Sequence, residues 1–341
     1  MNGIIIADKP AGWTSHDVVA KLRGALKIKR VGHGGTLDPM AIGVLPVFIG
    51  RATRAAEFLE NAEKEYIAGL KLGIVTDTQD ITGNILSENM DSVPLDAATA
   101  LSDVIPRFIG AQKQIPPMHS AIKQGGKKLY ELARQGVEVP REPRDITISE
   151  IELLDVGSPG IGLGCRLSGG VSGGCLSSGG LDGRLSGDGL GGNLSSDSPG
   201  GSGNEFLLRV ACSKGTYIRT LCHDIGTVLG CGGTMSSLQR TRAGIFTLGT
   251  AHTLDVILSA ISSGEIENIL MPVDSIFSAY PSATLNEATT RRCKNGVRFR
   301  VEDTADGMYR FYGPDDEFLL LGEVKNNELK VVKRFFEVNL P

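Results

Sequence analysis

The start of the chain predicts a short strand, a turn and a helix. Ile4 to Ile6 is an uninterrupted apolar run, typical of a buried strand, and the turn-forming residues 9–12 follow it. Thr14 with an acidic residue, Asp17, three positions later predicts a capping box at the start of a helix. The apolar positions that follow share one face of that helix: Val18, Val19, Leu22 and Leu26.

Strand-like and helix-like segments continue along the chain without a regular alternation. Strands are expected over Val44–Ile49, Tyr66–Leu72, Asn84–Leu86, Ile146–Leu154 and Phe206–Cys212. Helices are expected over Thr53–Leu59, Asp96–Val104, Lys127–Gln135 and Tyr217–Val228. This mixture favours an α+β fold over the repeated strand–helix–strand units of a doubly wound sheet. Residues 283–341 are basic first and acidic later, and they predict a separate small β-rich domain.

Residues 157–204 have a composition unlike the rest of the chain. Of these 48 residues 28 are Gly or Ser, and none is aromatic, Lys, Glu or Thr. Such a stretch cannot bury enough apolar surface to offset the conformational entropy lost on ordering. Strand-like segments flank it, so we expect a disordered insertion in a hairpin loop, which costs only about 2 kcal/mol in loop closure. Residues 1–156 and 205–275 are expected to form one larger domain.

Composition excludes several classes of protein and leaves nucleic-acid binding open. Apolar runs fall well short of the roughly 18 residues of a membrane helix, and the N-terminus does not resemble a signal peptide, so a cytoplasmic protein is expected. The six cysteines include no Cys-x-x-Cys pair, which disfavours a zinc site. The net charge is −4, yet residues 1–54 hold eight Lys/Arg against three acids and residues 105–145 hold eight against four. These regions could attract phosphates, although an ordinary solvated surface explains the charges equally well.

A glycine-rich loop at Gly32 to Pro39 presents the first candidate catalytic residue, Asp38. Glycines let the backbone come close to a ligand, and proline favours an extended conformation at the residue before it. An aspartate with the ordinary pKa of about 3.9 is ionised near neutral pH and could act as a nucleophile or base. The alternative, a turn aspartate hydrogen-bonded to its own backbone, is the commoner role for such a residue.

Two further segments carry aromatic and cationic side chains suited to a site that binds a base. Tyr66 is expected on a strand, where an exposed ring can stack on a base with about 1–3 kcal/mol, although a core tyrosine is commoner. Tyr217 and Arg219 follow a turn at Gly215 and begin a helix. An arginine at this position can hold a carboxylate through two hydrogen bonds, and the alternative is an arginine on the helix surface.

Taken together, these segments resemble the bacterial tRNA pseudouridine-55 synthase family (TruB type). The resembling stretches occur in the family's order: Gly3–Val18, Gly32–Pro46, Lys64–Gly83, Pro116–Gly136, Cys212–Gly226 and Leu238–Phe246. Their combination covers nearly all of residues 1–250 outside the insertion and is far more specific than any one of them. The resemblance implies a mixed, mainly antiparallel sheet with flanking helices, followed by a small PUA-like RNA-binding domain at residues 283–341.

The resemblance also implies an activity and a set of site residues. The reaction would be the isomerisation of uridine 55 in the T-loop of tRNA, with the base flipped out of the RNA and with no cofactor or metal. Asp38 would be the catalytic nucleophile, held by a salt bridge to Arg219. The implied substrate-binding residues are His33, Tyr66, Tyr217, Arg219 and Leu238. The implied partner is the T-arm of tRNA, bound by a monomer that needs no other protein.

The chain departs from the family's pattern at Gly34 and Ile42, where threonine is usual, so the geometry of the Asp38 loop could differ. Two other functions remain open at this point. A non-catalytic RNA-binding protein on the same scaffold would bind tRNA without forming pseudouridine. A guide-dependent synthase of the same superfamily would need a guide RNA and partner proteins.

Overall fold

The computed structural model describes residues 1–154, 203–297, 299–301 and 304–336. Residues 157–202 of the Gly/Ser-rich stretch, for which disorder was expected, lie outside this description. The last residue of that stretch, Asn204, is buried within the fold. Its carbonyl oxygen accepts from the Leu72 amide at 2.8 Å, and its Nδ2 donates to the Leu72 carbonyl oxygen at 2.9 Å.

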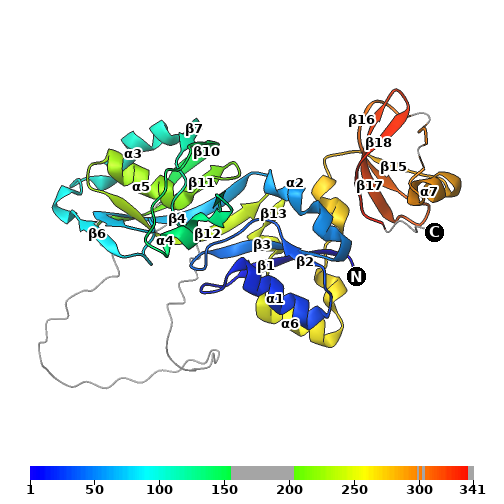
Figure 1. Cartoon of the computed structure of the whole chain (residues 1–341), viewed down its shortest axis with the longest axis horizontal. Coiled ribbons are helices and arrows are strands. Elements are labelled where there is room, and N and C mark those ends of the chain that lie inside the picture. Colours follow the sequence, from blue (N-terminus) through cyan, green and yellow to red (C-terminus); the bar gives the residue numbers. More distant parts are fainter. Residues whose placement is uncertain (155–202, 298, 302–303, 337–341) are drawn as a thin grey trace, which may run out of the picture.

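A mixed and mainly antiparallel sheet forms the centre of the larger domain (Figure 1). Its main path runs β14-β1-β3-β12-β4-β11-β10-β7, with β2 attached to β3 and β13 attached to β12. The pairs β1–β14 and β3–β12 are parallel, and the others on this path are antiparallel. The bounds are β1 Gly3–Lys9, β2 Val31–His33, β3 Ile42–Ile49, β4 Lys64–Leu72, β7 Gly110–Gln114, β10 Arg144–Leu154, β11 Glu205–Cys212, β12 Gly233–Ala243, β13 Phe246–Thr247 and β14 His252–Thr253. The α+β fold expected from the sequence is confirmed.

Strand β1 shows why the first apolar run has no polar interruption. Ile4, Ile5 and Ile6 are all fully buried, because both faces of the sheet are covered at this point. Ile5 packs on the side of helices α1 (Ser15–Leu26) and α6 (Leu254–Ser263). Ile4 and Ile6 belong to the cluster that reaches toward the C-terminal domain.

Helices flank the sheet, and the first of them starts at the capping signal of the sequence. Helix α1 has the expected capping box, in which the Asp17 amide donates to Thr14 Oγ1 at 3.1 Å and the Thr14 amide donates to Asp17 Oδ2 at 2.8 Å. Helices α3 (Ala97–Val104) and α5 (Ile218–Val228) cover the other half of the sheet. Within the described part of the chain, no helix is long and apolar enough to cross a membrane.

Two predicted helices differ from the structure. The expected helix over 53–59 is a 3-10 helix, η1 (Gly50–Ala55), that continues as the short helix α2 (Ala56–Glu60). The expected helix over 127–135 is reduced to α4 (Leu129–Ala133), because the preceding lysines pair in the hairpin β8 (Lys123–Gln124) and β9 (Lys127–Lys128).

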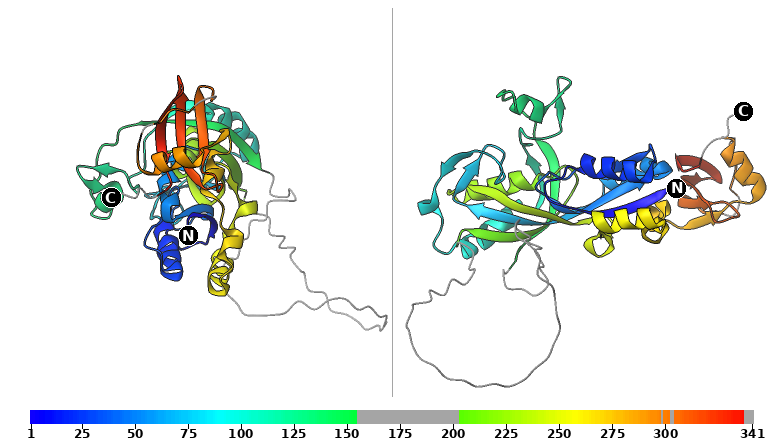
Figure 2. Two further views of the ribbon diagram at one scale, coloured as in Figure 1. Left: turned by 90° about the vertical axis from the view of Figure 1, so that its right-hand side faces the viewer. Right: turned by 90° about the horizontal axis from the view of Figure 1, so that it is seen from below.

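The expected strand over 84–86 is β6 (Ile85–Glu88), which pairs with β5 (Ile74–Thr76). Figure 2 shows the β8–β9–α4 segment projecting from the body of the domain.

A four-stranded sheet in the order β15-β16-β17-β18 forms a small C-terminal domain together with helix α7. The bounds are β15 Ser282–Thr284, α7 Glu287–Lys294, β16 Gly307–Tyr312, β17 Phe318–Lys325 and β18 Glu328–Arg334. An aromatic cluster joins it to the larger domain, since Phe277 contacts Phe58 at a ring-centroid distance of 5.0 Å and Phe335 at 5.8 Å. Arg54 Nη1 adds a hydrogen bond to the Arg334 carbonyl oxygen at 3.1 Å.

Candidate active site

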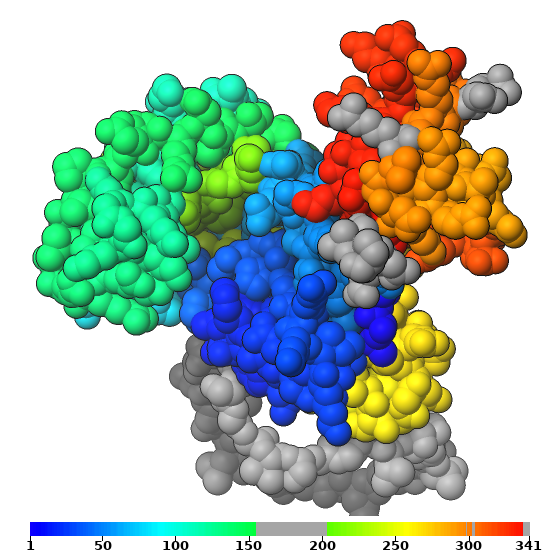
Figure 3. Space-filling model, turned by 45° about the vertical axis from the view of Figure 1, so that its right-hand side comes forward, coloured from blue at the N-terminus to red at the C-terminus, as the bar shows by residue number. Residues whose placement is uncertain are grey.

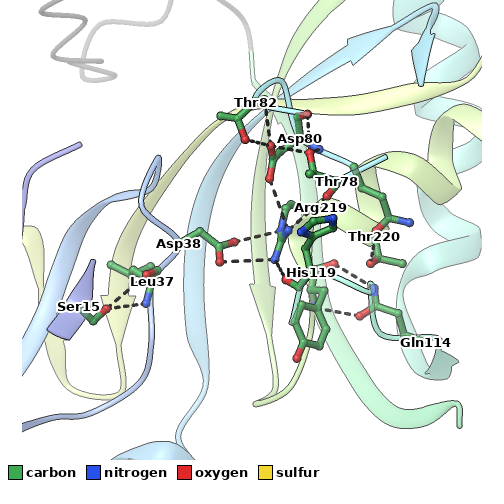
Figure 4. Close-up of polar contacts among 12 residues, drawn as sticks. Ser15, Leu37, Asp38, Thr78, Asp80, Thr82, Gln114, His119, Arg219 and Thr220 are labelled. Atoms are coloured by element: carbon green, nitrogen blue, oxygen red, sulfur yellow. Dashed lines mark hydrogen bonds and ion pairs between the residues drawn. The ribbon is translucent and has the colours of Figure 1, made fainter. Parts of the chain in front are cut away.

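Asp38 lies on the loop between β2 and β3, and this loop is held on both sides of the carboxylate. On one side, Ser15 Oγ accepts a hydrogen bond from the Leu37 amide at 2.9 Å. On the other, the Pro39 carbonyl oxygen accepts from the Gly12 amide at 2.8 Å. The start of helix α1 and the turn before it therefore fix the backbone on which Asp38 stands (Figure 4).

Lys9 ties the same loop to the end of strand β1. Its side chain is fully buried, and its ammonium donates to the carbonyl oxygens of Trp13 at 2.6 Å, Pro10 at 2.9 Å and Pro39 at 3.2 Å. Burial lowers the pKa of Lys9 to about 8, against the opposing effect of the Asp38 charge. The ammonium thus remains charged at neutral pH and serves a structural role beneath the loop.

Arg219, in the first turn of α5, forms the predicted salt bridge with Asp38. Its Nε lies 3.0 Å from Asp38 Oδ2, and its Nη2 lies 3.5 Å from Asp38 Oδ1. The same guanidinium donates from Nη2 to the His119 carbonyl oxygen at 3.0 Å and from Nη1 to the Thr78 carbonyl oxygen at 3.3 Å. The Arg219 side chain is only 6% exposed, so the interpretation of a surface arginine is wrong. Figure 4 shows it between the two acidic residues Asp38 and Asp80.

Asp80 is the second acid of the site, and sequence reasoning did not select it. Its side chain is 7% exposed, and its Oδ2 lies 3.5 Å from Arg219 Nη1. Its Oδ1 accepts hydrogen bonds from Thr78 Oγ1 at 2.9 Å, from the Thr82 amide at 3.0 Å and from Thr82 Oγ1 at 2.5 Å. Asp80 is therefore a fixed anion. It pairs with Nη1 of the guanidinium, while Asp38 pairs with Nε and Nη2.

Opposing effects act on the carboxyl group of Asp38. Burial raises its pKa above the ordinary value of 3.8, and the nearby charge of Asp80 adds to that rise. The Arg219 and Lys9 cations act in the other direction and favour the carboxylate. The side chain is 36% exposed, so a ligand can reach it. An accessible carboxylate held by a buried guanidinium is suited to act as a nucleophile.

Tyr66 lies on β4, opposite a buried arginine, Arg240 of β12. Burial raises the pKa of the Tyr66 phenol, and the charges of Arg240 and Asp38 also act on it. Arg240 Nε donates to the Val44 carbonyl oxygen at 2.7 Å, and Nη2 donates to the Gly35 carbonyl oxygen at 3.3 Å. Arg240 thus joins β12 to β3 and to the glycine-rich loop, at the position that pairs with Tyr66 on β4.

The structure also places the remaining predicted site residues. Tyr217 stands at the N-cap position of α5, and burial raises the pKa of its phenol, on which the charges of Arg219 and Asp38 also act. Leu238 is buried on β12 in the same apolar cluster as Leu37. His33, at the end of β2, packs edge-on against His16 with the ring centroids 5.2 Å apart.

The imidazole of His33 provides a prediction about pH. Burial, followed by the positive charges of His16 and Arg240, lowers the pKa of His33 from 6.5 to about 4. Folding therefore favours the neutral ring. The resulting contribution to folding stability is complete above about pH 6.5 and is lost as the pH falls through 4. We expect wild type to lose stability relative to His33→Asn over this window, as measured by the free energy of unfolding at pH 7, 5.5 and 4. Parallel pH curves for the two proteins would contradict the assigned pKa.

Gly34, one of the two departures from the family's pattern, is matched to its surroundings in this chain. A Cβ atom at this position would lie 2.7 Å from Leu59 Cδ2 and 2.8 Å from Phe48 Cε2. A threonine would require both side chains to shift. The Asp38–Arg219 pair forms with Gly34 and Ile42 in place, so neither departure removes the ion pair.

Comparison with known proteins places this chain in a family. A model described as TruB family pseudouridylate synthase (N terminal domain) matches residues 23–172, and one described as tRNA pseudouridylate synthase B C-terminal domain matches residues 219–278. The chain is 39% identical to the tRNA pseudouridine synthase B of Alkaliphilus oremlandii (strain OhILAs) over 348 residues, which cover 99% of both chains. It is 35% identical to the protein of the same name from Clostridium kluyveri over 340 residues, covering 98% of this chain and 100% of that one.

A solved structure shares the fold. A crystal structure of a Cbf5–Nop10–Gar1 complex contains a chain that aligns with a TM-score of 0.64 and 26% identity, covering 99% of this chain and 86% of that chain. The relatives define the class of the chain as an isomerase that forms pseudouridine in RNA. The chain belongs to the TruB family of pseudouridylate synthases.

Proposed function

We propose that this chain isomerises uridine 55 in the T-loop of tRNA to pseudouridine, with Asp38 as the nucleophile. The observation that carries the proposal is the 3.0 Å ion pair between Asp38 Oδ2 and Arg219 Nε. The charge of Asp38 acts on the phenols of both Tyr66 and Tyr217, which supports a shared site for the three side chains. The full-length relatives, named tRNA pseudouridine synthase B, support tRNA as the substrate.

The proposed reaction uses the carboxylate of Asp38 without a cofactor. Asp38 attacks C1′ of the nucleoside, and the C1′–N1 bond breaks with its electron pair leaving on N1. The uracil rotates within the pocket, C5 forms a new bond to C1′, and the Asp38 oxygen leaves. The C5 hydrogen departs as a proton and N1 gains a proton, so the product is an isomer of the substrate. Arg219 keeps the Asp38 oxygens in place for both attack and departure.

The target nucleotide has to leave the RNA stack to reach Asp38. Flipping a base costs a few kcal/mol, which stacking on an aromatic ring can offset at about 1–3 kcal/mol per base. Tyr66 and Tyr217 are proposed to contact the flipped base, with Leu238 beneath them. His33, uncharged at neutral pH, is proposed to contact the RNA where the base leaves the stack.

Two lobes are proposed to hold the T-arm on either side of the site. Figure 3 shows a hollow between the lobe around residues 105–145 and the C-terminal domain. The first lobe carries eight Lys/Arg against four acids, and helix α7 of the second ends in Arg291, Arg292 and Lys294. Such positive surfaces attract the phosphate backbone. The C-terminal domain is thus proposed to be a PUA-like RNA-binding domain, acting on tRNA in the cytoplasm.

The proposal is tested with the purified chain and an unmodified tRNA transcript, without guide RNA or any other protein. We expect stoichiometric pseudouridine at position 55, located by chemical mapping of the product. A matched transcript with cytidine at position 55 should bind with similar affinity and give no pseudouridine. Product at another uridine, or activity that appears only with a guide RNA and partner proteins, would contradict the proposal. Binding of both transcripts with no product from either would favour the non-catalytic RNA-binding protein.

A further inference from the structure

A side-chain amide makes two hydrogen bonds to the backbone of Tyr217. Gln114 Oε1 accepts from the Tyr217 amide at 2.8 Å, and Gln114 Nε2 donates to the Tyr217 carbonyl oxygen at 3.1 Å. Figure 4 shows Gln114 at the end of its strand, directed toward this segment. Gln114 is 5% exposed, although β7 is the last strand of the sheet and its neighbours alternate between exposed and half-buried.

Tyr217 needs this support because it precedes the first turn of α5. Its backbone angles are φ −99° and ψ 108°, outside the helical region, and no side chain caps the helix from this residue. The amide of an N-cap residue has no partner within the helix. Gln114 provides that partner and so fixes the peptide from which the Tyr217 ring projects, two residues before Arg219.

The segment that starts at Gln114 returns to the same helix at its other end. The His119 carbonyl oxygen accepts from Arg219 Nη2 at 3.0 Å. The chain from Gln114 to His119 therefore touches the start of α5 twice, once at the tyrosine and once at the arginine. The two contacts together fix the backbone of Tyr217 and the guanidinium of Arg219 relative to each other.

We propose that Gln114 is a positioning residue for the isomerisation, which acts by fixing the backbone from which the Tyr217 ring projects. This inference rests on the proposed function, in which Tyr217 contacts the flipped base. Gln114 itself touches neither the nucleoside nor Asp38. Misplacing a group by about 1 Å can cost about 100-fold in rate, so a backbone clamp of this kind affects the rate of chemistry.

The test compares Gln114→Ala with wild type in single-turnover reactions on a tRNA transcript. We expect the rate to fall by about 10- to 100-fold, with tRNA affinity unchanged within about threefold. Gln112→Ala is the matched control, because Gln112 lies on the same strand and donates to the Phe108 carbonyl oxygen rather than to α5. That variant should react at the wild-type rate.

A second background shows whether Gln114 acts through Tyr217. In Tyr217→Ala, the further change Gln114→Ala should cost no additional rate, because the ring that it positions is gone. The inference would be overturned if Gln114→Ala reacted at the wild-type rate. It would also be overturned if the rate loss of the double variant were the product of the two single losses. Neither result would affect the proposed function. Tyr217→Ala at the wild-type rate would overturn both this inference and the role of Tyr217 in the proposed function.

Gln114→Glu keeps the test decisive should the alanine variant fail to fold. It preserves the length of the side chain and the acceptor for the Tyr217 amide, but it places a carboxylate oxygen against the Tyr217 carbonyl oxygen. We expect a rate loss of about tenfold or more with the protein folded at the assay temperature. A rate that falls only in proportion to the folded fraction, measured by thermal unfolding, would overturn the inference.

Discussion

Asp38→Asn is expected to abolish pseudouridine formation while leaving tRNA binding intact. Asparagine fills the same space but provides no carboxylate to attack C1′, so we expect the single-turnover rate to fall by at least about 10⁴-fold. The Tyr66 and Tyr217 rings and the basic lobes remain, so the dissociation constant for tRNA should change by less than about threefold. Quantification of pseudouridine in the digested product, beside a binding titration, measures both quantities.

The same variant separates catalysis from folding. Because burial raises the pKa of Asp38 in the fold, its ionised form opposes folding, and this opposition grows as the pH rises through that pKa. Asp38→Asn should consequently unfold at the same temperature as wild type or slightly higher near neutral pH. Asp103→Asn, on the exposed face of α3, is the control and should keep full activity. An active Asp38→Asn protein would show that Asp38 is not the nucleophile.

Arg219→Lys is expected to have the second-largest effect, with a rate loss of about 100- to 1000-fold. Lysine keeps the positive charge, but one ammonium cannot reproduce the contacts of the guanidinium with Asp38, Asp80 and two carbonyl oxygens. The position of the Asp38 oxygens is then no longer fixed. Since Arg219 is buried, the thermal unfolding temperature is measured together with the single-turnover rate.

Asp80→Asn tests the same network with a smaller perturbation. The amide can still accept from Thr82, but its NH₂ group would face Arg219 Nη1, so we expect a rate loss of about tenfold or more with tRNA affinity retained. Asp77→Asn is the matched control, because Asp77 lies in the same loop and its carboxylate accepts from Asn84 rather than from Arg219. Equal rates for Asp80→Asn and Asp77→Asn would show that Asp80 does not support the site.

Local sequence signals predicted the fold well where short-range physics decides the structure. The capping box at Thr14, the buried strand at Ile4 and the helix after Tyr217 all depend on residues close in the chain. The lysine-rich segment before α4 was less predictable. Its helical pattern continues through Lys127, but the Leu129 amide donates to the Ile122 carbonyl oxygen, and this return contact favours a hairpin.

The supporting residues of the site were not predictable from the sequence, because long-range contacts define them. Asp80 stands in a turn-rich segment typical of an exposed loop, and its partner Arg219 is 139 positions away. Gln114 and Tyr217 are separated by 103 positions. The Asp38–Arg219 pair itself was predicted through the family resemblance, since neither residue carries a local signal that names the other.

The most direct test is a crystal structure of Asp38→Asn bound to a tRNA T-arm that carries uridine at position 55. We expect that nucleotide outside the RNA stack, with its base against Tyr66 and its C1′ in contact with the side chain of residue 38. A structure in which the uridine stays stacked in the loop, or in which its C1′ lies against a different carboxylate, would contradict this expectation.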